Sequence, residues 1–138
     1  MRLTIIPLVN PTEQQYIDLS KIWLDQNRTQ LEQNLESGVH FYGARFNERL
    51  LAAAKVVIYQ QQGTICDFNV REITRRRGVG LYLLQEICRQ QPEIHHWIFD
   101  LQGVEPQNKI ALEKFLVACG FQPTEETHHW QLNIEPSV

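Results

Sequence analysis

Three adjacent arginines and two glycines form the stretch of this sequence best suited to binding an anion. The residues are Arg75-Arg76-Arg77-Gly78-Val79-Gly80, which have the form Arg-x-x-Gly-x-Gly. An extended run (residues 64–74) precedes them, and an amphipathic helical pattern (residues 79–90) follows. The first backbone N–H groups of a helix lack internal partners and, with the helix dipole, attract anions. One guanidinium group can donate two parallel hydrogen bonds to the oxygens of a phosphate. This stretch therefore predicts a pyrophosphate site.

A second explanation of the same stretch remains open at this point. A basic loop with a glycine turn and solvated arginines would have the same residues. Glycines favour the first explanation, because a backbone without Cβ atoms can approach a bound anion closely.

Composition narrows the class of protein. A chain of 138 residues with 43% hydrophobic and 21% charged residues is typical of one folded domain, here residues 1–138. The formal net charge of −3 argues against a nucleic-acid binder, and no apolar run is long enough for a membrane span. The first residues, through Pro7, are too short for the apolar core of a signal peptide. Three cysteines without Cys-x-x-Cys spacing are typical of reduced, buried thiols, so we expect a cytoplasmic protein.

Hydrophobic periodicity predicts eleven elements in the order β, α, α, β, β, β, α, β, α, β, β. The expected strands cover residues 3–8, 39–46, 50–59, 64–70 and 96–101, followed by two short strands at 121 and 129–134. The expected helices begin at Pro11–Thr12 with a Thr12–Gln15 capping box, at 29, at 79 and at Pro106.

This order predicts an α/β fold with a mixed, mostly antiparallel central sheet and helices on both of its faces. The step from residue 64 through the helix at 79–90 to residue 101 should be a right-handed parallel crossover. The glycine turn would then lie at the carboxyl end of a strand, where open α/β sheets bind ligands.

The element order and the Arg-x-x-Gly-x-Gly turn resemble the GCN5-related N-acetyltransferase (GNAT) fold. The segment from Ala111 through Phe115 to Cys119-Gly120-Phe121 is similar to the last helix of that superfamily and its Gly-Phe ending. Residues 44–53 and 70–80 resemble the PanM/PanZ family more specifically, and residues 3–6 and 17–23 are also similar to it. The resemblance covers nearly the whole chain, and it is looser in the C-terminal third.

The PanM/PanZ resemblance implies a regulatory function. Members of this family bind acetyl-CoA or CoA and associate with the zymogen of aspartate α-decarboxylase. They promote its self-cleavage, which generates the pyruvoyl group, and they couple pantothenate and CoA synthesis to the level of CoA. The resemblance therefore implies acetyl-CoA or CoA as cofactor and aspartate α-decarboxylase, as zymogen and mature enzyme, as partner.

Carried over by position, the resemblance also assigns site residues. Pantetheine would lie beside the end of the fourth strand and the pyrophosphate on the turn and helix start. The implied cofactor-binding residues are Phe68, Asn69, Val70, Thr74, Arg75, Arg76, Arg77, Gly78, Val79, Gly80 and Leu81. The turn after residue 44 would belong to the partner surface, with Arg45 and Asn47 as contacts, although Asn47 also suits a plain turn.

The groups needed for acetyl transfer are incomplete. In many GNAT enzymes a tyrosine four residues before the glycine of the Gly-Phe ending returns a proton to the CoA thiolate, and here that position is Leu116. Asp67, Glu72 and Asp100 are candidate bases without a diagnostic motif. We therefore expect no catalytic residue and favour a regulator, while an N-acetyltransferase that moves acetyl from acetyl-CoA to an amine remains the alternative.

Metal binding and thiol chemistry are not expected. The pairs His95-His96 and His128-His129 lie in strands, whose consecutive side chains point to opposite faces, so neither pair chelates one ion simply. Cys119 comes at a helix end, where the dipole does not stabilise a thiolate.

Overall fold

The computed structural model describes residues 3–23, 27–71, 78–102, 104 and 106–134 of the chain. Within these residues, seven strands and four helices occur in the expected order. They are β1 (Thr4–Pro7), α1 (Glu13–Ile22), α2 (Arg28–Glu36), β2 (His40–Phe46), β3 (Arg49–Tyr59), β4 (Gln62–Val70), α3 (Val79–Gln90), β5 (His96–Asp100), α4 (Pro106–Ala118), β6 (Gln122–Pro123) and β7 (His129–Asn133).

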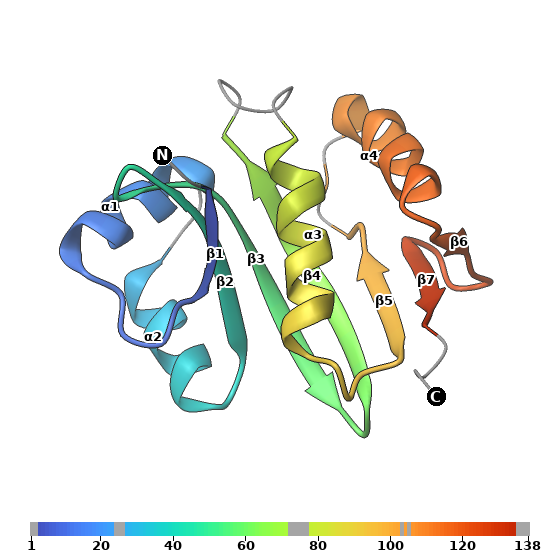
Figure 1. The fold of residues 1–138 in the computed structure, drawn as a ribbon, viewed down its shortest axis with the longest axis horizontal. Coiled ribbons are helices and arrows are strands. Elements are labelled where there is room, and N and C mark those ends of the chain that lie inside the picture. Colours follow the sequence, from blue (N-terminus) through green and yellow to red (C-terminus); the bar gives the residue numbers. More distant parts are fainter. Residues whose placement is uncertain (1–2, 24–26, 72–77, 103, 105, 135–138) are drawn as a thin grey trace.

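The strands form one mixed sheet in the order β1-β2-β3-β4-β5-β7-β6 (Figure 1). Strands β1 to β4 are antiparallel neighbours, and residues 62–65 of β4 pair in parallel with residues 96–99 of β5. This pairing confirms the expected parallel step, since α3 connects the two strands. The later strand β7 lies between β5 and β6 and is antiparallel to both.

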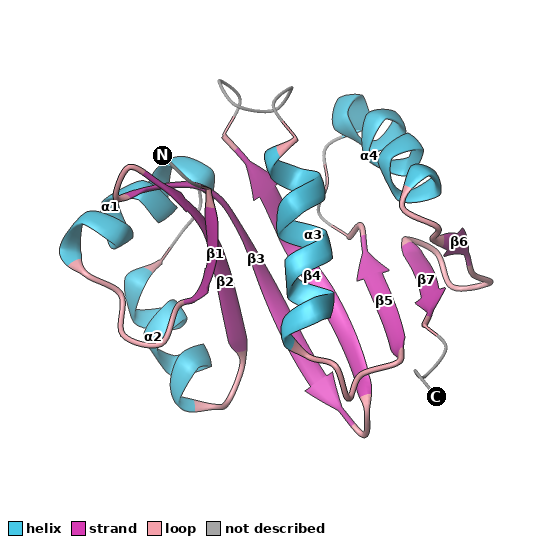
Figure 2. Ribbon diagram, viewed as in Figure 1, coloured by secondary structure: helices cyan, strands magenta, loops and turns pink. Residues whose placement is uncertain are grey.

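Helices cover both faces of the sheet (Figure 2). Along β2, Phe41 belongs to one buried cluster with Leu19 of α1 and Leu31 of α2. The next residue, Tyr42, belongs to a second cluster with Leu83 of α3. Because successive strand side chains point to opposite faces, α1 and α2 lie on one face and α3 on the other, as expected.

Local signals explain where the helices begin and end. Thr12 and Gln15 form the expected capping box of α1: the Gln15 N–H donates to Thr12 Oγ1 (3.1 Å), and the Thr12 N–H donates to Gln15 Oε1 (2.9 Å). The second helix begins one residue earlier than expected, because the Asn27 side chain caps it by accepting from the Gln30 N–H (3.2 Å). Gly38, with φ of 89°, ends it.

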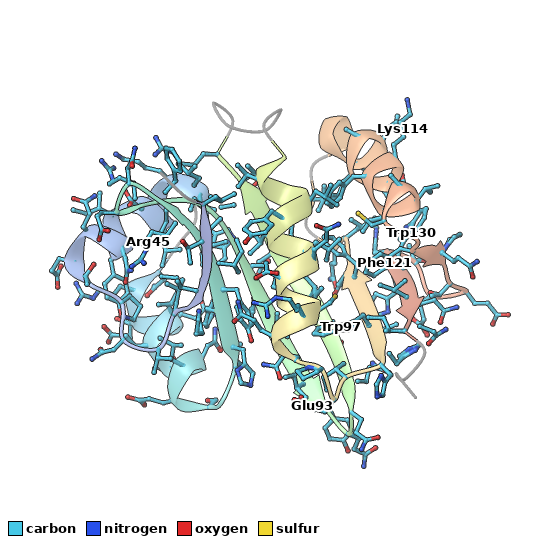
Figure 3. All side chains as sticks on the ribbon, in the orientation of Figure 1. Arg45, Glu93, Trp97, Lys114, Phe121 and Trp130 are labelled. Atoms are coloured by element: carbon cyan, nitrogen blue, oxygen red, sulfur yellow. The ribbon has the colours of Figure 1, made fainter. Side chains whose placement is uncertain are left out.

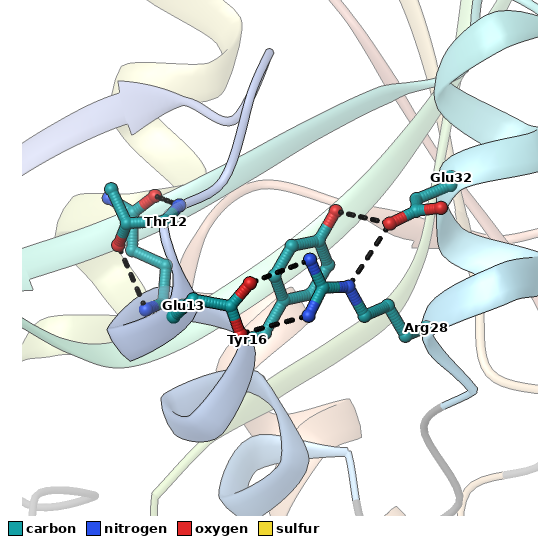
Figure 4. Close-up of polar contacts among 6 residues, drawn as sticks. Thr12, Glu13, Tyr16, Arg28 and Glu32 are labelled. Carbon is teal, nitrogen blue, oxygen red and sulfur yellow. Dashed lines mark hydrogen bonds and ion pairs between the residues drawn. The ribbon is translucent and has the colours of Figure 1, made fainter.

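The helices α1 and α2 are joined by an exposed polar cluster around Arg28 (Figure 4). Its guanidinium donates to both oxygens of Glu13 at 2.9 Å and to Glu32 at 3.1 Å, and it lies 4.0 Å from the centre of the Tyr16 ring. Hydrogen bonds from Arg28 lower the pKa of the Glu13 carboxyl. All of these charged groups are well exposed, so the cluster orients α2 on α1 more than it stabilises the fold.

Three side chains differ from the sequence expectations in their exposure. Cys66, Cys88 and Cys119 are free thiols, but each is only half-buried, so the expectation of full burial was wrong. Within the described part of the chain, no helix is both long and apolar enough to cross a bilayer.

Candidate functional site

The end of β4 is distorted by one extra residue. In the pairing with β3, Lys55 lies opposite Cys66 and Ala53 lies opposite Asn69, so two residues of β4 face the single residue between them. Asp67 has a left-handed φ of 50° at this bulge. A bulge bends its strand and takes the extra residue out of the ladder, so β4 changes direction where the cofactor-binding residues were expected.

Strand β4 continues beyond its pairing with β5. The paired residues in this described part of the sheet end at Ile65 and Phe99, whereas β4 runs on to Val70. Figure 1 shows β4 extending past the end of the β5 arrow. The last five residues of β4 therefore extend beyond the part of the strand that pairs with β5, and an extended ligand would lie beside them.

The start of α3 packs against this end of β4. Gly78 is the N-cap, with a left-handed φ of 73°, and the Tyr82 N–H makes the first helical bond to its carbonyl (3.1 Å). A Cβ atom on Gly80 would lie 3.4 Å from Val70 Cγ2 and 3.6 Å from the Phe68 ring. The helix start therefore packs directly against the strand, with room for a Cβ in ordinary van der Waals contact, and the positive end of the helix dipole lies beside the end of β4.

Aromatic rings support this end of β4 from the core. The Phe68 ring lies 5.3 Å from that of Phe99 on β5 and 6.0 Å from that of Phe115 on α4, and Phe121 packs edge-on against Phe99 at 6.0 Å. Figure 3 shows Phe121 and Trp130 on the α4 side of the molecule. The wall of the site is thus a packed apolar layer, which contributes shape and not acid–base chemistry.

The last residues of α1 contact the bulge directly. Trp23 Nε1 donates to the Asp67 carbonyl at 2.6 Å, and Asn69 Nδ2 donates to the Ile22 carbonyl. Asn69 Oδ1 in turn accepts from the Val70 N–H at 3.1 Å. Asn69 thus has a structural role in shaping β4, which its sequence position did not reveal.

The β2–β3 turn is tightly fixed. Asn47 and Glu48 both have left-handed φ (52° and 65°), as a two-residue hairpin turn requires, and both side chains are exposed. Directly after the turn, Arg49 Nη2 donates to the buried Asp18 carboxylate of α1 at 2.7 Å, and the Leu50 N–H donates to the same group at 3.0 Å. Arg45 lies at the end of β2, half-buried, on the α1 side of the view in Figure 3.

Among the described residues, the candidate acid–base groups are poorly placed for acetyl transfer; Glu72 lies outside those residues. Leu116 is fully buried in the core, so no proton donor is present at that position. Tyr82 is exposed near the helix start, Asp67 is exposed at the bulge, and Asp100 accepts from the Gln102 N–H (2.8 Å). Burial, assisted by the Asp67 carboxylate, raises the pKa of the Cys66 thiol to about 11, so it is not a nucleophile near neutral pH.

Other possible sites are less developed. Among the described residues, no three side chains of the types that bind metals gather in one place. An open hollow of about 350 Å³ runs along α4, lined by Ile110, Glu113, Lys114 and Val117, none of which was expected in a site.

The structure brings together most of the described residues that the sequence singled out. Phe68 and Val70 lie next to Gly80 in the first turn of α3, whereas the Asn69 side chain bonds the Ile22 carbonyl of α1. Val79 is buried, while Leu81 is exposed. Thr74, Arg75, Arg76 and Arg77 lie outside the described residues. Sequence reasoning missed the contribution of Trp23 and the bulge at Asp67, since neither residue type signals a contact across 44 positions.

Comparison with known proteins agrees with this geometry. The family model "Acetyltransferase (GNAT) domain, PanZ" matches residues 2–131. The "PanD regulatory factor" of Escherichia coli K12 is 40% identical over 131 residues, which cover 95% of this chain and 98% of that protein.

Solved structures have the same fold. E. coli YhhK, determined in solution bound to coenzyme A, superposes with a TM-score of 0.82 at 40% identity and covers 96% of this chain and 99% of its own. A Bacillus subtilis acetyltransferase in complex with CoA has a TM-score of 0.68 at 14% identity, over 97% of this chain and 100% of its own. At that identity the second likeness supports the fold alone.

Proposed function

Because the chain belongs to the PanZ family of GNAT domains, we propose that it is a CoA-responsive regulator of aspartate α-decarboxylase. In this proposal it binds acetyl-CoA or CoA, associates with the decarboxylase, and promotes self-cleavage of the zymogen to the pyruvoyl form. It thereby couples pantothenate and CoA synthesis to the level of CoA. The observation that carries the proposal is the packing of a glycine-bearing helix start against the end of β4, beyond the residues that pair with β5.

The described residues fit a CoA molecule. The N–H groups at the start of α3, around Gly78 and Gly80, suit a pyrophosphate, since they lack partners within the helix. The end of β4 from Phe68 to Val70, which extends beyond β5, suits the pantetheine arm, which would lie beside it as an extended chain. The segment from Thr74 to Arg77 would add charge for the phosphates. CoA itself would supply the chemical signal, namely whether an acyl thioester or a free thiol is present.

We assign the partner surface to the β2–β3 turn. Asn47 and Glu48 present their side chains to solvent, and the Asp18 carboxylate holds the following residues against α1. A rigid turn loses little conformational entropy on binding, which favours a specific protein contact. Arg45 would contribute a positive charge beside it. With such a partner, and with free thiols, we place the protein in the cytoplasm.

A catalytic role in amine acetylation is the alternative function. Its support is the fold, and the buried Leu116 weighs against it. The two functions separate in one assay, because a catalyst releases CoA thiol from acetyl-CoA across a panel of amines, whereas a regulator does not.

The test of the proposal is a zymogen cleavage assay. Purified protein mixed with the decarboxylase zymogen and acetyl-CoA should accelerate the appearance of the two cleaved chains. An unchanged cleavage rate, with both proteins folded, would reject the proposal.

Two variants assign the surfaces within that assay. Gly78→Asp places a negative charge at the helix start and should weaken both CoA binding and acceleration. Asn47→Ala removes an exposed side chain from the turn and should weaken acceleration while CoA binding is preserved. Equal loss of both activities in Asn47→Ala would reject the assignment of the turn.

A further inference from the structure

The C-terminal end of α1 is joined to the β4 bulge by two hydrogen bonds. Trp23 Nε1 donates to the Asp67 carbonyl at 2.6 Å, and the Ile22 carbonyl accepts from Asn69 Nδ2. These bonds span 44 and 47 positions of the sequence, so they form only when the two layers of the domain are assembled.

The bulge needs such support. Asp67 adopts a left-handed φ of 50°, a region that residues other than glycine occupy infrequently, although aspartate tolerates it better than most. The extra residue of a bulge also leaves the ladder locally disrupted, so its carbonyl needs a partner from elsewhere. The indole N–H of Trp23 is that partner, and a disfavoured backbone conformation persists only where neighbouring groups hold it.

The indole is itself held in place by α1 and the sheet. Trp23 packs edge-on against Phe41 of β2, with ring centres 5.8 Å apart, and the backbone N–H of Trp23 donates to the Leu19 carbonyl at 2.8 Å. The ring therefore enters the bulge from a fixed direction, and it contacts neither the glycines of α3 nor their helix start in any described interaction.

We propose that Trp23 is a positioning residue of the cofactor site, which holds the Asp67 peptide and so fixes the direction of the last residues of β4, beside which the pantetheine arm of CoA would lie. This inference rests on the proposed function. Trp23 acts on the strand half of the site, while the helix start around Gly78 and Gly80 acts on the phosphate half. Loss of its N–H should therefore weaken binding of the arm and spare binding of the nucleotide.

Trp23→Phe tests this division, because phenylalanine keeps an aromatic ring and removes the donor. Calorimetric titration compares CoA with 3′-phosphoadenosine 5′-diphosphate, which is its nucleotide half without the arm. We expect the affinity for CoA to fall about three- to tenfold, the equivalent of one hydrogen bond, and the affinity for the nucleotide to stay within about twofold. Tyr16→Phe is the matched control, since it removes a different aromatic donor from α1, one that faces Glu32 at 3.4 Å, and it should leave both affinities unchanged.

Each outcome bears on the inference. An equal fall for both ligands would indicate general loosening of the fold and would overturn it. Unchanged CoA affinity in Trp23→Phe would also overturn it, while CoA binding by the unaltered protein would leave the proposed function standing. Failure of the unaltered protein to bind CoA would instead refute the proposed function.

A second measurement needs no variant. The indole N–H resonance of Trp23 should exchange slowly with solvent and should shift when CoA is added, but not when the nucleotide half is added. Rapid exchange, or an equal shift with both ligands, would contradict the positioning role.

Discussion

Asp18→Ala should destabilise the protein, because Asp18 holds the start of β3 against α1. The Asp18 side chain is fully buried, and it accepts hydrogen bonds from Arg49, Leu50 and Gln14. Its removal leaves the buried Leu50 N–H without this acceptor, which costs about 1–3 kcal/mol. The side chain of Arg49 is 43% exposed and regains water, so we add nothing for it. The expected loss in the free energy of unfolding is about 2 kcal/mol.

Urea unfolding at neutral pH measures this loss. Asp18→Asn should lose less, because its amide oxygen still accepts from the Leu50 N–H. Arg28→Gln is a control that breaks an ion-pair cluster whose side chains are about half or more exposed, and it should leave the midpoint nearly unchanged. The reasoning would be refuted if Asp18→Ala unfolded at the same urea concentration as Arg28→Gln.

The stability lost in Asp18→Ala should depend on pH. Burial on its own raises the pKa of the Asp18 carboxyl, but hydrogen bonds from Arg49, Leu50 and Gln14 outweigh it, so the folded pKa lies below the usual 3.8. A carboxyl group whose pKa is lower in the folded than in the unfolded protein contributes its full stabilisation above the unfolded pKa. This contribution is lost as the pH falls through the folded pKa. The stability difference between the unaltered protein and Asp18→Ala should thus be constant from about pH 5 to 8 and shrink below about pH 4. A difference that grew in acid would contradict the assignment.

Two further predictions concern the site and the thiols. Gly80→Val should lower CoA affinity at least about tenfold by calorimetry, because a Cβ would already contact Val70 Cγ2 at 3.4 Å and the added methyls need further room. Gly80→Ala should lose less affinity. Equal CoA affinities of Gly80→Val and the unaltered protein would refute the packing of the helix start against β4. Burial raises the pKa of Cys88 to about 12 and that of Cys66 to about 11. Iodoacetamide at pH 8 should therefore label both thiols slowly in the folded protein and rapidly in guanidinium. Fast labelling of the folded protein would contradict the partial burial of these thiols.

Sequence patterns identified the elements of this fold because their signals are local. The capping box at Thr12, the apolar rows of α3 and the glycine that ends α2 each depend on neighbours a few positions away. The expected bounds of α3, residues 79–90, are those observed. The parallel step also followed from local signals, since a helix between two strands leaves few other connections.

The internal support of the site could not be predicted in this way. The Trp23 bond to Asp67 and the Arg49 bond to Asp18 join residues 44 and 31 positions apart. No residue spacing links Trp23 to Asp67, and although aspartate tolerates a left-handed backbone better than most residues, its presence alone does not locate a bulge. Such contacts depend on how the α1 layer meets the sheet, which hydrophobic periodicity does not specify.

Amide NMR during a CoA titration tests the central claim most directly. If CoA binds as proposed, saturable shifts should be largest at Phe68, Asn69 and Val70 on β4 and at Gly78 to Leu81 at the start of α3. Absence of saturable shifts in the folded protein, or shifts confined to the outer stripe of α4 around Ile110 and Val117, would contradict it.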